Sequence, residues 1–538
     1  MQRVAENREG TSLARATVVV ASLFVASRLL GLVRDILIAA RFGTSPDYDA
    51  YVAAFRLPDL VFLVVMSGAF GSAFIPVYIE LLTQESRQTA WRLANALLTL
   101  TLTVFLVVTA STLVVADALI RLVVAPGLPS DTQELAANLT RILMLSPLFL
   151  GTGSAAKAML ESESRFATPA FAPLLYNLGI IFGAIVLAPF AGIYGLAYGV
   201  VLGAAAYATL QLSALHRAGW RFRVVLSRRI RGLPEVLSLL GPRLIAQAAM
   251  QVNLLVTTNL ASRLGHQSIA SLQYAYQIFL LPHGVVALSL ATVLFPTLAQ
   301  YRSAGALEDL HRTFAPLLRI AVLVTLPAVV FFGFFPRAIV QTVFQVGAFT
   351  ATSTSLVAEA LRWFAPGLLA YAVVELLTRL SYAFKDSRSP VLAALVAVGA
   401  NTVFGLALMH PFGHRGLALS LALATTLEMF VLAYLLRRSL GIPYGPLFRG
   451  LGRAVPAVVA LTVAAHWFAR PLEQATDPAR GRSIGQLLVF GYTLASLGIA
   501  YAVVLLLARQ SDARSVFLAA SARLPRPVRR LCEAILEW

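Results

Sequence analysis

Long, continuous apolar segments separated by short polar stretches recur along the whole chain. A helix needs about 20 apolar residues to cross the hydrocarbon core of a bilayer, and about fourteen segments reach that length. They lie at residues 14–42, 50–82, 91–115, 135–161, 168–189, 192–215, 233–262, 268–300, 314–335, 354–384, 388–410, 414–436, 450–469 and 484–508. Transmembrane β-strands would instead be short and alternate in polarity. The pattern therefore predicts an all-α integral membrane protein with about fourteen transmembrane helices.

The distribution of charge predicts how these helices are oriented. Arginines cluster in alternate loops, around residues 217–231 and 437–453, and again in the tail, whereas the intervening loops hold few. The positive-inside rule then places both termini in the cytoplasm. The net charge of +18 is interpreted as topology and as attraction to anionic inner-leaflet lipids, not as a nucleic-acid footprint. The tail, residues 509–538, mixes arginines with apolar residues and predicts a basic amphipathic helix on the inner leaflet; a solvated tail is the alternative.

Enzyme chemistry has little support in the sequence. Cys532 is the single cysteine, so neither an internal disulfide nor a cysteine-based metal site is expected. Asp47 and Asp49 form a D-x-D pattern like that of membrane glycosyltransferases, but the loop around them is too short to hold an acceptor site. Zinc-ligand spacings, nucleophile elbows and phosphate loops are not found. We expect no catalysis, no cofactor and no metal.

The first two apolar segments carry charges at depths where lipid tails would lie. These are Arg28, Arg34 and Asp35 in the first segment, and Arg56 and Asp59 in the second, with Asp49 at its mouth. An ionised group there costs at least about 2.5–3.5 kcal/mol on insertion scales, so it normally faces a polar interior. Arginine offers a planar fork of donors that suits a diphosphate. The alternative is that Arg28 pairs with Asp35, and Arg56 with Asp59, only to join helices.

Other polar groups inside the spans are interpreted mainly as structural. The amides of spans seven and eight commonly bond neighbouring helices, and His283 is expected to be a satisfied interior histidine. Glu375 and Arg379 lie four residues apart on one helix, in reach of each other.

Several motifs resemble the MurJ/MviN family. In chain order they are SRLLGLVRD at 27–35, Phe42-Gly43, Asp49-Ala50, FRLPD at 55–59, the segment 68–76, Arg165-Phe166, PAFAP at 169–173 with Asn177, the segment 344–350, and Asp386 with Pro390. The resemblance covers most of spans 1–12. It implies the fold of the multidrug/oligosaccharidyl-lipid/polysaccharide exporter superfamily, with two six-helix lobes around a central cavity and two extra C-terminal helices. The lobes would be residues 1–215 and 233–438, and the extra helices residues 450–508.

The resemblance also implies a function, which is flipping of lipid II, an undecaprenyl-diphosphate saccharide, across the bacterial inner membrane by alternating access. It places the family's functional residues on Arg28, Arg34 and Asp49. From the local sequence we expect Asp35, Arg56 and Asn177 to bind substrate as well. We further expect coupling to the membrane potential or to a cation. The alternatives are a non-transporting scaffold of envelope assembly, or an exporter of a different lipid-linked saccharide or drug.

The chain departs from the family pattern at several charged positions. Phe62, Ser67, Tyr276, Gln277 and Leu280 stand where the family has charged residues, and Glu375 replaces a lysine. Three residues are candidates to compensate: Arg362, Glu375 and Arg379. The cargo is therefore left open by the sequence.

Overall fold

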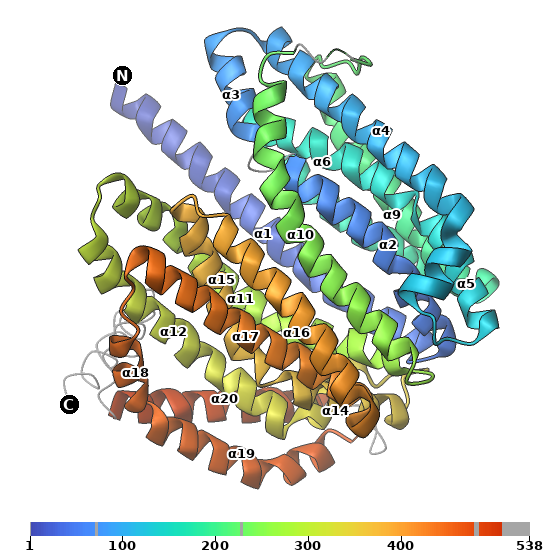
Figure 1. The fold of residues 1–538 in the computed structure, drawn as a ribbon, viewed down its shortest axis with the longest axis vertical. Helices are drawn as coiled ribbons and strands as arrows, with labels where there is room; N and C mark the ends of the chain where they lie inside the picture. Colours follow the sequence, from blue (N-terminus) through green and yellow to red (C-terminus); the bar gives the residue numbers. More distant parts are fainter. Residues whose placement is uncertain (1, 70–73, 226, 228–229, 478–483, 508–538) are drawn as a thin grey trace. The chain divides into compact units, whose positions relative to one another are not determined.

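The computed structural model describes residues 2–69, 74–225, 227, 230–477 and 484–507, and within that part of the chain every regular element is a helix (Figure 1). In the first half these are α1 (Gln2–Phe42), α2 (Pro46–Ala69), α3 (Phe74–Gln84), α4 (Arg87–Leu119), the π-helix η1 (Ile120–Val124), α5 (Ser130–Leu143), α6 (Ser146–Ser162), α7 (Ala167–Phe182), the π-helix η2 (Gly183–Leu187), α8 (Ala188–Ala191), α9 (Ile193–Arg217) and α10 (Leu233–Ser262). The second half comprises α11 (Ser268–Ser303), α12 (Leu307–Phe334), α13 (Pro336–Phe344), α14 (Ala351–Phe364), α15 (Gly367–Ala383), α16 (Arg388–Phe412), α17 (His414–Leu440), α18 (Gly445–Gly452), α19 (Val455–Ala475) and α20 (Ile484–Leu507).

The all-α membrane fold predicted from the apolar segments is confirmed. Among the described residues, nine helices are long and apolar enough to cross a membrane, or up to ten if the bent pair α14 and α15 counts as one span. That pair bends by 52° between Phe364 and Gly367, where Pro366 interrupts the helix. The count of fourteen stays a prediction, and the predicted amphipathic tail lies outside the described residues.

The chain forms two compact units, of which unit 1 comprises Met1–Ala270 and Val346–Phe349. Within it, α7 and the π-helix η2 that follows it pack on α9 through glycines, without side chains between them. A Cβ on Gly183 would lie 2.7 Å from the Cα of Gly199, and one on Gly203 would lie 2.5 Å from the carbonyl oxygen of Tyr176. Small residues let membrane helices approach this closely, and van der Waals contact then stabilises the pair.

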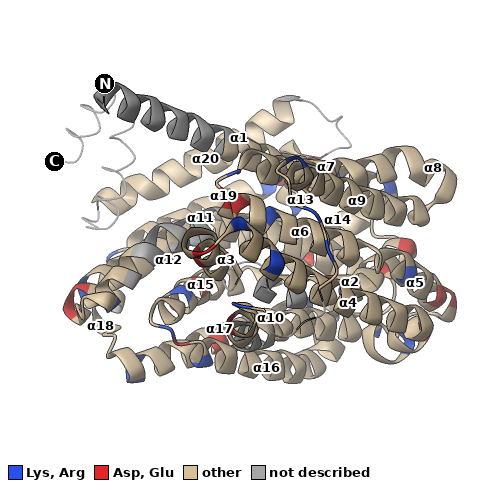
Figure 2. Ribbon diagram, turned by 90° about the horizontal axis from the view of Figure 1, so that it is seen from above, with Lys and Arg blue, Asp and Glu red and all other residues tan. Residues whose placement is uncertain are grey.

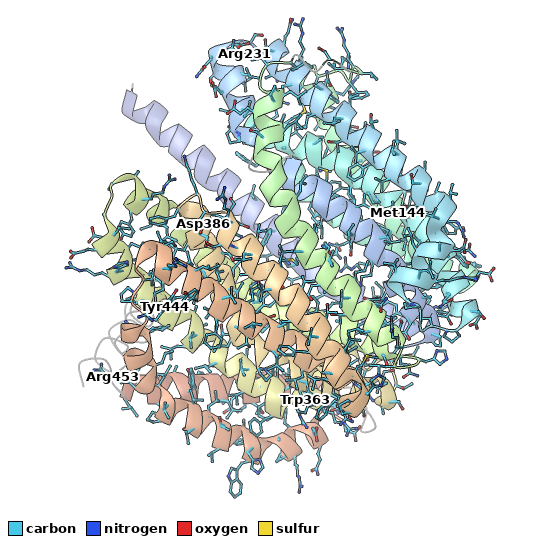
Figure 3. All side chains as sticks on the ribbon, in the orientation of Figure 1. Met144, Arg231, Trp363, Asp386, Tyr444 and Arg453 are labelled. Carbon is cyan, nitrogen blue, oxygen red and sulfur yellow. The ribbon has the colours of Figure 1, made fainter. Side chains whose placement is uncertain are left out.

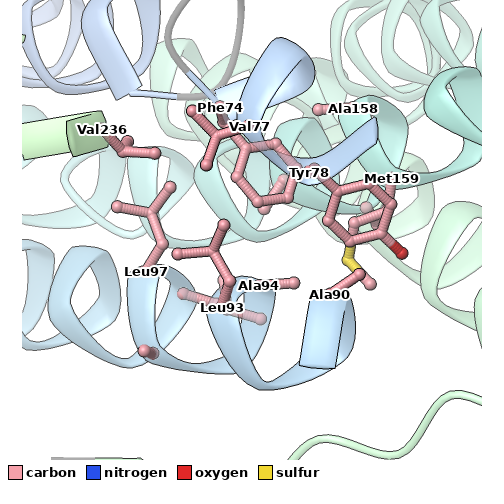
Figure 4. Close-up of a cluster of buried hydrophobic side chains, with 14 of the residues drawn as sticks. Phe74, Val77, Tyr78, Ala90, Leu93, Ala94, Leu97, Ala158, Met159 and Val236 are labelled. Carbon is pink, nitrogen blue, oxygen red and sulfur yellow. The ribbon is translucent and has the colours of Figure 1, made fainter. Parts of the chain in front are cut away.

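A hydrophobic cluster fills unit 1 between α3, α4 and α6 (Figure 4). Phe74 and Tyr78 are fully buried in the cluster, which also contains Leu93 and Met159. The ring centroids of Phe74 and Tyr78 are 5.0 Å apart. The Tyr78 hydroxyl donates to Glu163, which also pairs with Arg87. At the same end of unit 1, Arg231 pairs with Glu85 (Figure 3).

Helix α10 belongs to unit 1, although the predicted division placed residues 233–262 at the start of the second lobe. It packs along α2 and bonds the segment after α4 (Figure 1). The Asn259 amide donates to the carbonyl oxygen of Val123 at 2.6 Å, and the Gly127 amide donates to the Ser262 hydroxyl at 3.1 Å. The lobe boundary at residues 216–232 stays a prediction, because compact units defined by contacts need not coincide with the two predicted six-helix lobes.

Unit 2 comprises Ser271–Gln345 and Thr350–Trp538. In it, α16 packs on α17, α15 packs on α17 and α12, and α19 packs on α20. The Tyr501 hydroxyl joins α20 to α12 by donating to the carbonyl oxygen of Leu323 at 3.1 Å. Tyr444, between α17 and α18, donates to the carbonyl oxygen of Ala433 at 3.1 Å, and its burial raises its pKa to about 12 (Figure 3). Most of the ribbon carries uncharged residues, and lysine, arginine, aspartate and glutamate occupy few positions along the helices (Figure 2).

Candidate functional site

Arg34 on α1 organises a polar cluster inside unit 1. Its guanidinium contacts Asp35 through Nε at 2.9 Å and Nη2 at 2.8 Å, and Nη1 donates to the amide oxygen of Asn177 on α7 at 3.0 Å. Asn177 in turn donates to the carbonyl oxygen of Ser27 at 3.4 Å. The structure therefore brings together three residues predicted for the site: Arg34, Asp35 and Asn177.

The Arg34 guanidinium retains donors for a ligand. It has five N–H groups, and the three contacts above use one on each nitrogen. One N–H on Nη1 and one on Nη2 therefore have no partner among the described residues. The Arg34 side chain is 25% exposed. Two parallel N–H donors match two oxygens of one phosphate.

The second helix adds Arg56 and Asp59 to this cluster. Arg56 donates through Nε to the hydroxyl of Thr258 on α10 at 2.8 Å. Asp59 interacts electrostatically with both Arg56 and Arg34. The phenol of Tyr176 interacts electrostatically with Asp59 and Arg34. Four helices of one unit, α1, α2, α7 and α10, thus converge on a single charged group of side chains.

The charges in this cluster balance. Arg34 lies beside Asp35, and Arg56 lies within electrostatic range of Asp59, so two cations face two carboxylates. Arg34 pairs with a carboxylate, while the binding of a diphosphate by these arginines stays a prediction. The pairing differs from the helix-face expectation, since Asp35 contacts its neighbour Arg34. Adjacent helical positions do not face each other, but the long arginine stem lets its head reach back.

Arg28 is not part of the cluster. Its side chain is exposed, and its guanidinium carbon lies 5.2 Å from the centroid of the Phe24 ring. That is a cation–π contact one turn earlier on α1.

Asp49 has a structural place that the sequence did not reveal. It is fully buried, and its two carboxylate oxygens accept the backbone amides of Gln267 and Ala270, each at 2.6 Å. These amides are at the first turn of α11, where helix N–H groups have no partner within the helix. A negative charge at a helix N-terminus is also favoured by the helix dipole. Asp49 therefore caps α11 from a distant part of the sequence.

The predicted compensating residues belong to unit 2. Arg379 contacts Glu375 through Nε at 2.8 Å, as their spacing predicts. Arg362 is exposed and donates to the carbonyl oxygen of Gly333 on α12 at 3.1 Å. Glu375 and Arg379 thus form one pair, whereas Arg362 binds backbone.

The positions that depart from the family pattern are now mostly located. Phe62 packs against the hydrophobic cluster of unit 1. The Tyr276 hydroxyl lies 3.1 Å from that of Tyr371, and the buried amide oxygen of Gln277 has no hydrogen-bond partner among the described residues. The Ser67 side chain lies outside the described part.

Sequence reasoning missed three members of the unit 1 cluster: Tyr51, Tyr176 and Thr258. A single tyrosine or threonine in an apolar segment carries no signal of its own. Each of them nevertheless adjoins a position that had been singled out: Tyr51 follows Asp49-Ala50, Tyr176 precedes Asn177, and Thr258 precedes an amide of span seven.

Comparisons with known proteins agree on one family. The family described as "Lipid II flippase MurJ" matches residues 38–475. The chain is 31% identical over 470 residues to the lipid II flippase MurJ of Burkholderia cenocepacia, covering 85% of this chain and 90% of that protein. It is 29% identical over 426 residues to a probable lipid II flippase MurJ of Buchnera aphidicola, covering 78% of this chain and 83% of the relative.

Solved structures share the fold. A structure titled as the inward closed conformation of lipid II flippase MurJ superposes with a TM-score of 0.74 at 22% identity, covering 93% of this chain and 99% of that one. An inward-facing multidrug-resistance transporter of the MATE family gives 0.64 at 16% identity, covering 79% and 98%. The multi-pass architecture predicted for the inner membrane of a bacterium is thereby supported by both sequence and fold. This chain belongs to the lipid II flippase MurJ family.

Proposed function

We propose that this protein moves a lipid-linked diphosphate saccharide of the lipid II type from the inner to the outer leaflet of the bacterial inner membrane. The family is one of lipid flippases, and the proposal involves transport without a catalytic step. The observation that carries it is the guanidinium of Arg34, positioned by Asp35 and Asn177 inside a helical membrane unit.

The diphosphate is the group that this cluster would recognise. Carrying it through a membrane requires replacing its hydration shell, and Arg34 and Arg56 supply charge-assisted donors for that purpose. Asp35 and Asp59 keep these cations balanced when no ligand is present, which lowers the cost of burying them. An arriving phosphate would then compete with the carboxylates for the arginines. Arg28, exposed on the same helix, is proposed as an additional contact, and Asp49 as the residue that holds the start of α11.

The transport cycle is proposed to be alternating access, with both termini in the cytoplasm. Anionic lipids of the inner leaflet would interact with the arginine-rich loops on that side. Since an uphill or sustained cycle needs a driving force, we also propose coupling to the membrane potential or to a cation.

Complementation of a strain depleted of its own lipid II flippase tests the function. The wild-type chain should restore growth, and Arg34→Ala should not, at equal membrane abundance. Arg34→Lys should restore growth only in part, because lysine lacks the bidentate fork. Arg92→Ala, an exposed arginine of α4, is the matched control and should behave as wild type.

A wild-type chain that reaches the membrane but does not restore growth would contradict lipid II as the cargo. Growth with Arg34→Ala would contradict the assignment of the site while leaving the function standing.

A further inference from the structure

A second polar cluster lies wholly inside unit 2, apart from the residues of the proposed diphosphate site. Two helix faces form it. On α11, Tyr276 and His283 are seven residues apart and share a face, and on α15 Tyr371, Glu375 and Arg379 recur every four residues along one face.

The contacts join these faces directly. The imidazole of His283 meets the Tyr371 ring edge-on, with centroids 4.7 Å apart and an interplanar angle of 89°. The Tyr371 hydroxyl lies 3.1 Å from the Tyr276 hydroxyl. Glu375 interacts electrostatically with His283 and Tyr371, and Glu428 on α17 interacts with Tyr371. Three helices therefore contribute titratable groups to one place.

His283 itself is unsatisfied. The side chain is 7% exposed, and Nδ1 has no hydrogen-bond partner among the described residues. This differs from the satisfied interior histidine expected from the sequence. A buried polar atom left without a partner costs about 1–3 kcal/mol, so the presence of an unpaired nitrogen at this position requires an explanation, such as a ligand or a function.

We propose that His283, Glu375 and Glu428 form a proton-binding site in unit 2, whose loading and release drive the transport of the lipid. This inference rests on the proposed function and names the coupling ion that the proposed function leaves open.

The charges of the cluster favour the uptake of one proton. With both carboxylates ionised and His283 neutral, Arg379 neutralises Glu375 and Glu428 leaves one net negative charge. Among the described residues, Tyr371 packs on His283 and Tyr276 contacts Tyr371, and both phenols are neutral. One proton brings the whole cluster to neutrality, which is the state that costs least within a membrane.

The same geometry disfavours a metal cation. Hard cations prefer a shell of oxygen ligands. Here an imidazole and the guanidinium of Arg379 stand among the oxygens, and Glu375 already has a cation at 2.8 Å. Phe279 packs on Tyr276, Phe364 and Tyr371, with centroids between 5.6 and 5.9 Å, and the rings of Phe279 and Phe364 offer no ligand on this side of the cluster.

Transport in proteoliposomes loaded with lipid II tests the coupling. We expect an imposed pH gradient, acidic on the side toward which the lipid moves, to shift the steady-state distribution of lipid by up to about tenfold per pH unit for one proton per lipid. His283→Gln and Glu428→Gln should each abolish that shift. His466→Gln and Glu473→Gln, on α19 and outside the cluster, are the matched controls and should retain it. A sodium gradient at constant pH should produce no shift; if it does, the proton assignment is overturned.

Direct proton binding separates this inference from the proposed function. The purified full-length protein, titrated in detergent with a pH-indicator dye, should take up one proton that His283→Gln and Glu428→Gln both lack. Equal uptake by the wild type and the two variants would overturn the proton site, even if lipid II is flipped. Uptake that the variants lose, in a protein that does not flip lipid II, would overturn the proposed cargo and leave the proton site standing.

Discussion

The backbone amide of Ala348 donates a hydrogen bond to the carbonyl oxygen of Ala40 at 2.8 Å, which fastens the segment Val346–Phe349 to the end of α1 within unit 1. Two glycines make this contact possible. Gly43 and Gly347 have φ values of +54° and +60°, and a Cβ on either would collide with the backbone of Ala348 or Ala40, respectively. Two motifs far apart in the sequence, at 42–43 and 344–350, thus serve one junction.

Gly347→Ala should weaken this junction. Left-handed backbone costs a residue with a Cβ roughly 1–2 kcal/mol, and the collision with Ala40 adds to it. We expect a lower melting temperature in detergent and reduced membrane abundance. Gly399→Ala, where a Cβ would meet nothing within 4 Å, is the control. Equal melting of the two variants would show that the junction is not needed for stability.

Asp49→Asn should destabilise the start of α11. The amide keeps one acceptor oxygen and loses the other, so one of the two backbone amides at Gln267 and Ala270 loses its partner. Loss of a helix cap costs about 0.5–2 kcal/mol. Thermal unfolding in detergent measures it, with the exposed neighbour Asp47→Asn as the control. If both variants melt alike, the cap contributes nothing.

Asp35→Asn should increase the affinity for an anionic lipid. The substitution removes the carboxylate that competes for Arg34, while the amide oxygen still accepts a hydrogen bond. A charge-assisted contact is worth about 1.5–3 kcal/mol, so the dissociation constant for lipid II should fall about tenfold or more. Asp117→Asn, which breaks a different Arg–Asp pair of unit 1 with Arg141, is the control. Weaker binding by Asp35→Asn would mean that Asp35 orients Arg34 rather than competing for it.

Phe62→Arg should not restore a family-like anion site. Phe62 packs against an apolar cluster, so an arginine there would be a charge desolvated without a partner, at a cost of roughly several kcal/mol. We expect lower thermal stability and unchanged lipid II affinity, with Phe62→Leu as the apolar control. Tighter binding of lipid II by Phe62→Arg would contradict this and show that the position faces the ligand.

Reporter fusions test the orientation. A reporter fused after Arg231 should lie in the cytoplasm and one fused after Arg480 outside it, as the positive-inside rule requires. The ion pair of Arg231 with Glu85 fits this, because both residues lie in loops predicted to be cytoplasmic. Finding both reporters on one side would contradict the fourteen-helix topology.

The sequence predicted the helices well because membrane spans are specified by long apolar runs. It also pointed to Arg34 and Asp35, since buried charge is rare enough in such runs to be informative, and to Asn177 through the motif at 169–177. It did not predict that Asp49 caps α11, because the partner is a backbone amide more than two hundred positions away and leaves no mark in the local pattern.

The pairing inside the site was also beyond the sequence. Helix periodicity places Arg28 and Asp35 on one face, yet the flexible stem of Arg34 reaches Asp35 instead. Periodicity fixes where a Cβ points and not where a long side chain ends. Likewise, Thr258 became a partner of Arg56 only because α10 packs along α2.

The glycine contacts that α7 and η2 make with α9 have a mechanical consequence. Sliding one helix past the other by a single position would drive the side chains beside Gly179, Gly183, Gly199 and Gly203 into the facing backbone, which has no room for a Cβ. We therefore expect the two packed segments to move together as one rigid body. Any rearrangement of unit 1 during transport is then expected to occur outside this rigid pair of helices. Asn177, which accepts a hydrogen bond from Arg34, belongs to the pair and should move with it.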